Sequence, residues 1–85
     1  MNIAYAPGFI RSYKKLPQEL KEDVKRVILL FQDDANHVVL RVHKLSGSLQ
    51  GKHAFSLNYR DRIIFRFEKN GTATMLAIGD HDMYR

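Results

Sequence analysis

The sequence contains no cysteine, and this absence excludes several kinds of site. Without a thiol the chain can form neither a disulfide nor a zinc ribbon, and it has no cysteine nucleophile. A chain of this kind suits the reducing cytoplasm, which is the compartment we expect. No apolar run approaches the roughly 18 residues that a membrane-spanning helix needs, and no hydrophobic secretory region stands at the N-terminus. We therefore expect no membrane partner.

Motifs for metals and nucleotides are also missing. The four histidines, His37, His43, His53 and His81, show no i, i+4 or other short ligand spacing, and no cysteine supports them. The pairing of His81 with Asp82 is too common to indicate a metal phosphohydrolase. There is no glycine-rich phosphate-binding loop. The sequence thus predicts neither a metal nor another cofactor.

What the chain does contain is a moderate apolar fraction and an excess of positive charge. Its 85 residues are 45% hydrophobic, which fits one globular domain, residues 1–85, with a single small core. Fourteen Lys and Arg against nine Asp and Glu give a formal charge of +5. This balance favours a polyanionic partner or an acidic protein, and the alternative is a merely soluble basic surface.

Apolar periodicity predicts helices in the first part of the chain. Residues 1–6 alternate as in a short strand, which Pro7 and Gly8 end. A helical hairpin is expected over about residues 8–34, interrupted at Pro17. The stripe that defines its second helix is Leu20, Val24, Val27, Ile28 and Phe31.

The second part of the chain reads as strands. Residues 38–42 include the β-branched Val38, Val39 and Val42 and fit either a strand or an extended crossing segment, whereas residues 53–59, 62–67 and 72–78 fit an antiparallel sheet. Asn70-Gly71 predicts a hairpin turn, since both residues tolerate positive φ. The order β-α-α-β-β-β predicts an α+β fold with the helical hairpin packed on one face of a mainly antiparallel sheet. In the strand at 62–67, Ile63, Phe65 and Phe67 share one face, and Arg62, Ile64 and Arg66 share the other.

Several motifs in a fixed order make a family resemblance. After the helical hairpin come Leu45-Ser46-Gly47, then Tyr59-Arg60-Asp61-Arg62-Ile63-Ile64-Phe65, and, beyond a hairpin, Ile78-Gly79-Asp80-His81-Asp82-Met83-Tyr84. This arrangement resembles the RelE/ParE superfamily of bacterial toxins from type II toxin-antitoxin systems, most closely the RelE/YafQ-type mRNA interferases. Each motif is weak alone, but their order and spacing cover nearly the whole chain.

The resemblance implies a function. A RelE/YafQ-type chain would be a compact α+β toxin that cleaves mRNA on the ribosome without a metal and inhibits translation. A cognate antitoxin would neutralise it, and the complex would bind operator DNA through the antitoxin. Two alternatives stay open: a ParE-like toxin that poisons DNA gyrase without acid-base chemistry, and an inactive relative that only binds its antitoxin.

Metal-free RNA cleavage needs a base for the ribose 2′-hydroxyl, an acid for the departing 5′-oxygen, and a cation for the phosphate. Arg62 is the candidate cation, because it opens a strand where the family has an arginine; alternatively it pairs with Glu68 or Asp61. Lys44, Lys52, Arg60 and Arg66 are predicted RNA-binding residues that attract the backbone rather than transfer protons.

Histidines are the candidates for proton transfer, since their ordinary pKa lies near 6.5. His81 matches a Gly-x-His turn of the YafQ-like branch, and alternatively it caps that turn. His43 begins a His-x-Leu-x-Gly motif that resembles the family's active-site histidine. His53 stands at a strand start, although its alternation with Phe55 also allows it to face the core. Tyr84 matches a late aromatic position that would stack on a base, or it packs on the sheet edge.

Overall fold

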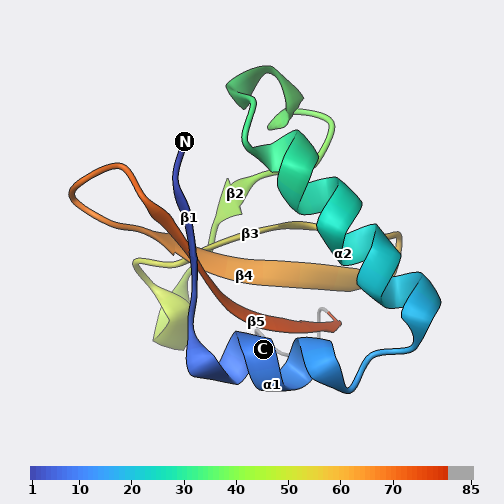
Figure 1. Ribbon diagram of the computed structural model, residues 1–85. Helices are drawn as coiled ribbons and strands as arrows, with labels where there is room; N and C mark the ends of the chain where they lie inside the picture. The colour runs from blue at the N-terminus through green and yellow to red at the C-terminus, as the bar shows by residue number, and fades with distance from the viewer. Residues whose placement is uncertain (81–85) are drawn as a thin grey trace.

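The computed structural model describes residues 1–80 as two helices packed on a five-stranded sheet (Figure 1). The strands lie in the order β1-β5-β4-β3-β2, with β1 parallel to β5 and the other pairs antiparallel. In chain order the elements are β1 (Ile3–Tyr5), α1 (Pro7–Lys14), α2 (Gln18–Phe31), the 3-10 turn η1 (Asp34–Asn36), β2 (His43–Lys44), the 3-10 turn η2 (Gly47–Leu49), β3 (His53–Ser56), β4 (Asp61–Phe67) and β5 (Ala73–Asp80). The predicted α+β class and the helical hairpin on one face are confirmed.

A proline stands at the N-terminus of each helix, where a missing backbone N–H costs no hydrogen bond. Pro7 is the first residue of α1, where its missing N–H is not needed, and Pro17 immediately precedes α2. The apolar stripe predicted for α2 is buried at Val24, Val27, Ile28 and Phe31. Within the described residues, no helix is long and apolar enough to cross a membrane.

The core lies between the helices and one sheet face. Phe31 of α2 is fully buried, and its ring stacks on Phe55 with the centroids 4.6 Å apart. The ring of Phe65 meets Phe31 edge-on at 4.8 Å. Ile63 and Met75 complete the sheet side of this cluster. These contacts fix which face of β3 and β4 turns toward the helices.

The segment at residues 38–42 is neither a strand nor extended. It folds as consecutive turns, and the Val42 N–H donates to the carbonyl of His37. The reason lies in the preceding residues: Asn36 Nδ2 donates to the carbonyl of Leu30 and His37 Nε2 to that of Phe31, both at 2.8 Å. These side-chain bonds to carbonyls at the end of α2 turn the chain back before β2; the Leu30 carbonyl also accepts from the Asp33 N–H.

β5 carries one extra residue relative to β4. Ile64 pairs with Ala77, but Phe65 pairs with Met75, so Leu76 has no partner across the strand. This β-bulge shifts the alternation of β5, and Ile78 therefore packs toward the core on the same side as Met75.

The predicted hairpin between β4 and β5 is present, although only one of its two residues uses positive φ. Gly71 has φ 86°, whereas Asn70 is absent from the positive-φ residues. The Gly71 N–H donates to the Glu68 carbonyl, which is the pattern of a turn followed by a glycine bulge. The Asn70 side chain accepts from the Thr72 N–H at 3.0 Å and so supports the turn from outside.

Candidate functional site

The sheet face opposite the helices holds the predicted phosphate-binding arginine. We call it the Arg62 face; in β4 it comprises Arg62, Ile64 and Arg66, which alternate with the core residues Ile63 and Phe65. The residues paired across from them are mostly small: Ser56 and Gly79 beside Arg62, Ala54 and Ala77 beside Ile64, and Thr74 beside Arg66. Small partners thus flank both arginines on this face, and Ile64 between them is buried.

Arg62 is held by backbone carbonyls. Its Nη1 donates to the carbonyl oxygens of Asn58 and Asp61, both at 3.0 Å. Carbonyl dipoles orient the guanidinium without neutralising it, unlike a carboxylate partner. The predicted alternative, a pair with Glu68 or Asp61, is not among the ion pairs of the described residues. Among residues 1–80, Arg62 therefore has no carboxylate partner and can bind an external anion.

Arg66 and Arg60 differ in this respect. Arg66 Nε donates to Glu68 Oε1 at 2.6 Å, and this hydrogen bond and charge raise the pKa of Arg66 above its ordinary value. Arg60 Nε lies 3.5 Å from Asp61 Oδ1. Both arginines are exposed, so their predicted role as RNA contacts would require RNA to compete with a carboxylate.

His43 shares the Arg62 face. It pairs with Ala54, whose neighbour in β4 is Ile64, so its side chain points to the same side. Its Nδ1 lies 2.7 Å from the carbonyl oxygen of Arg41, and therefore carries the proton. In the neutral ring Nε2 is then the acceptor nitrogen, which is the form that a general base requires.

His53 lies on the opposite face. It pairs with Phe65, and its ring centroid is 5.4 Å from that of Phe65 and 5.0 Å from that of Phe67. Burial lowers the pKa of His53 below its ordinary value, and the charges of Lys44 and His43 lower it further. Its Nδ1 is buried without a hydrogen-bond partner. His53 is therefore separated from Arg62 by the sheet.

Lys44 and Lys52 gather around His53 rather than around Arg62. They line a depression of about 660 Å³ in the loop between β2 and β3, together with Ser46, Gly47, Gln50 and Gly51. The structure thus makes two groups, one with Arg62 and His43 and one with both lysines and His53. His81 and Tyr84 lie outside the described residues. No cluster of three or more His, Cys, Asp or Glu that could hold a metal occurs within residues 1–80.

The sequence places Asn58 at the start of a turn over residues 58–61, but it assigns that residue no role in the site. Its side chain organises the turn between β3 and β4, which supplies both carbonyls that hold Arg62. An asparagine that opens a four-residue turn before a strand was the available signal, because its side chain readily accepts from the backbone two residues on.

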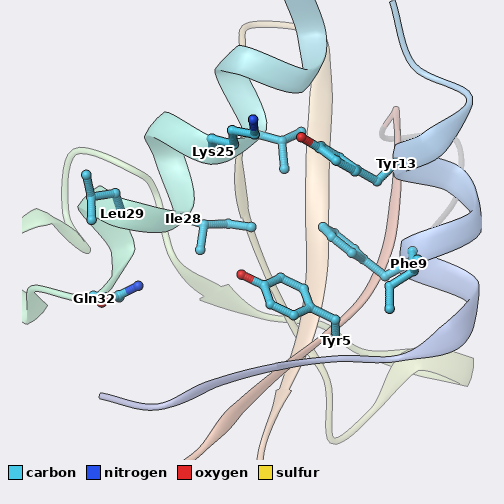
Figure 2. Close-up of a pocket in the computed structure, with 9 residues that line it drawn as sticks. Tyr5, Phe9, Tyr13, Lys25, Ile28, Leu29 and Gln32 are labelled. Atoms are coloured by element: carbon cyan, nitrogen blue, oxygen red, sulfur yellow. The ribbon is translucent and has the colours of Figure 1, made fainter. Parts of the chain in front are cut away.

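A separate apolar groove of about 450 Å³ runs between α1 and α2 (Figure 2). Tyr5, Phe9 and Tyr13 project into it from one side, and Ile28 and Leu29 line the other. Leu29 is 70% exposed and Tyr5 46% exposed, so apolar surface here faces solvent. Lys25 stands at the edge, and Lys21 Nζ lies 5.8 Å from the ring centre of Tyr13.

No family model matches the sequence, and a search of curated proteins finds no match to it. Solved structures share its fold over nearly the whole chain. YafQ from E. coli is 18% identical with a TM-score of 0.70, over 96% of this chain and 94% of that one. A YoeB/ParE toxin from Agrobacterium tumefaciens is 12% identical with a TM-score of 0.69, over 95% and 99%. The toxin-antitoxin complex YoeB-YefM from Staphylococcus aureus gives 25% identity and a TM-score of 0.68, over 95% and 97%.

Proposed function

Because this chain has the fold of the RelE/ParE superfamily of toxins, as its motifs predict, we propose that it is the toxin of a type II toxin-antitoxin system. In this proposal it acts in the cytoplasm as a ribosome-dependent endoribonuclease that cleaves mRNA. The observation that carries the enzymatic part is the placement of Arg62 and His43 on one sheet face, with the Nδ1 of His43 held 2.7 Å from the Arg41 carbonyl oxygen.

The roles follow from the chemistry of the two side chains. His43 Nε2 takes the proton of the ribose 2′-hydroxyl, and the 2′-oxygen attacks the phosphorus while the bond to the 5′-oxygen breaks. Arg62 stabilises the negative charge that builds on the phosphate. β2 and β4 flank β3, so their backbones are roughly 10 Å apart, enough for one nucleotide between the side chains. The acid for the 5′-oxygen is assigned to His81, by resemblance alone.

Induced expression followed by primer extension on cellular transcripts tests this function. We expect breaks linked to codons, which Arg62→Ala and His43→Gln should reduce by at least about a hundredfold, the usual scale for a lost acid-base or charge-stabilising group. Arg26→Ala is the matched control, since Arg26 is an exposed arginine on α2 paired with Asp23. Growth arrest with intact transcripts and an SOS response would favour the gyrase-poisoning alternative, and no arrest would favour the inactive relative.

We further propose that the groove between α1 and α2 binds an acidic amphipathic helix of the cognate antitoxin. An apolar face would cover the exposed side chains of Tyr5, Ile10 and Leu29, and acidic side chains would meet Lys21 and Lys25. The charge of α1 supports the same partner, because its last turn carries Arg11 and Lys14 and its first turn no acid.

Substitution within the groove tests this interface. We expect Leu29→Lys to weaken binding of the co-expressed antitoxin by tenfold or more, because it places a charge in the apolar contact. Val39→Lys is the control, since Val39 is equally exposed but does not line the groove. Isothermal titration with purified antitoxin gives both affinities; equal affinities would contradict the proposed interface.

A further inference from the structure

The turn between β3 and β4 is built around one side chain, that of Asn58. Its Oδ1 accepts from the backbone N–H groups of Arg60 at 2.9 Å and of Asp61 at 2.7 Å. Its Nδ2 donates to Asp61 Oδ2 at 3.1 Å. Backbone N–H groups of Leu57 and Asn58 both point to the Asp61 carbonyl. The half-buried amide therefore determines where the carbonyl groups of this turn lie.

Two of those carbonyls hold Arg62. Nη1 carries two hydrogens, and the carbonyl oxygens of Asn58 and Asp61 accept from Nη1 at 3.0 Å each. The remaining N–H groups belong to Nη2 and Nε, which form the guanidinium edge that binds phosphate oxygens in pairs. A turn that fixes Nη1 thus also fixes the direction in which this edge faces.

The same amide also binds the carboxylate of the residue before Arg62. Asp61 precedes Arg62, and its two oxygens meet Asn58 Nδ2 and Arg60 Nε. Arg66, by contrast, is paired with Glu68, which follows the end of β4. The geometry points to Asn58 as a positioning residue: it orients the guanidinium of Arg62 toward an RNA phosphate and keeps Asp61 engaged elsewhere. This inference rests on the proposed function for the identity of the anion.

A double-mutant cycle on RNA binding tests the inference. The probe is a single-stranded RNA oligonucleotide with 2′-deoxy substitution, which binds but cannot be cleaved. We expect Asn58→Ala to weaken its binding roughly tenfold, the scale of a hydrogen bond to a charged group. In the Arg62→Ala background the same change should have no further effect, because Asn58 acts through Arg62. Asn58→Asp keeps the acceptor oxygen for the two backbone bonds and should recover part of the affinity.

Side-chain NMR gives a readout that a general loss of stability would not reproduce. In the wild type the Nη1 bonds should slow rotation of the Arg62 guanidinium and give separate ¹⁵Nη signals, which merge in Asn58→Ala. Asn70→Ala is the matched control, since Asn70 also accepts from a backbone N–H in a turn but lies in the β4–β5 hairpin. If Asn58→Ala does not fold, Asn58→Asp replaces it in the double-mutant cycle with Arg62→Ala.

Three results would overturn the inference: wild-type affinity in Asn58→Ala, an equal further loss in the Arg62→Ala background, or no RNA binding by the wild type. A cycle that closes as expected in a chain that cleaves no RNA would support the positioning role while removing the nuclease function. The two proposals can therefore fail separately.

Discussion

At the scale of single residues, His53 offers the sharpest test of the electrostatics. Burial, then Lys44 and His43, lower its pKa below the ordinary 6.5. Because the unfolded chain then binds the proton more readily, the contribution of His53 to stability is present above pH 6.5 and is lost as the pH falls through the folded-state pKa. We expect His53→Phe, which keeps a ring against Phe65 and Phe67, to lose less stability than the wild type between about pH 7.5 and about pH 5 in urea unfolding.

The cause of the shift can be checked separately by an NMR titration of the His53 ring. Lys44→Met removes a positive charge on the same face, so we expect it to raise the pKa of His53. Lys69→Met, in the β4–β5 turn, should leave that pKa unchanged. A wild-type pKa at or above 6.5 would contradict the assignment of His53 to a desolvated site.

Residue alternation was sufficient to predict the side of the sheet for most candidates. Arg62 and Ile64 alternate with Ile63 and Phe65, and the structure places them on opposite faces. The pattern could not predict that Arg62 would bind carbonyls, because hydrogen bonds of a turn depend on backbone angles that alternation does not contain. Alternation with Phe55 allowed His53 to face the core, as the structure shows, but the pattern could not predict the face of His43, because the register of β2 on β3 is set across a loop.

At the scale of elements, the attachment of α2 to the sheet depends on Phe31. We expect Phe31→Ala to reduce the free energy of unfolding by about 3–5 kcal/mol, since it removes a fully buried ring that contacts Phe55 and Phe65. Leu29→Ala on the same helix is the control and should change it by less than about 0.5 kcal/mol, because that side chain is exposed. Urea unfolding measures both, and a loss below about 1 kcal/mol for Phe31→Ala would contradict the packing.

Two glycines, Gly71 in the β4–β5 hairpin and Gly8 in α1, should respond differently to substitution by alanine. Gly71 has φ 86°, so Gly71→Ala should destabilise the chain by about 1 kcal/mol, whereas Gly8 lies in α1 with room for a methyl group and Gly8→Ala should not. Thermal unfolding of the two variants side by side gives the sign of each change. Equal shifts would show that the turn does not require a left-handed residue.

Helix α2 and strand β4 were predictable because each has a long apolar pattern with the period of its own secondary structure. The segment at residues 38–42 was not, since its β-branched residues favour a strand when read alone. In the folded chain His37 stacks on Phe31 and bonds to its carbonyl, and these contacts override the local preference.

At the scale of the whole molecule, the net charge of +5 predicts that RNA binding weakens steeply with salt. Each phosphate contact to a single strand contributes about −0.7 to the slope of log K against log salt. We expect Lys44→Gln, Lys52→Gln and Arg62→Gln each to reduce the slope by about that amount. Fluorescence anisotropy at several salt concentrations measures this, with Lys14→Gln on α1 as the control; an unchanged slope for all three would exclude these residues as phosphate contacts.

The unpaired residue Leu76 changes which side chains of β5 face each side of the sheet, and this determines the neighbour of Arg62. In an uninterrupted ladder Ile78 would point to the Arg62 face and Gly79 to the core. The additional residue exchanges them, so the residue beside Arg62 is one without a side chain. The guanidinium therefore gains the room that a branched neighbour would have filled, and the space proposed for a nucleotide depends on Leu76, the unpaired residue three positions earlier in the strand.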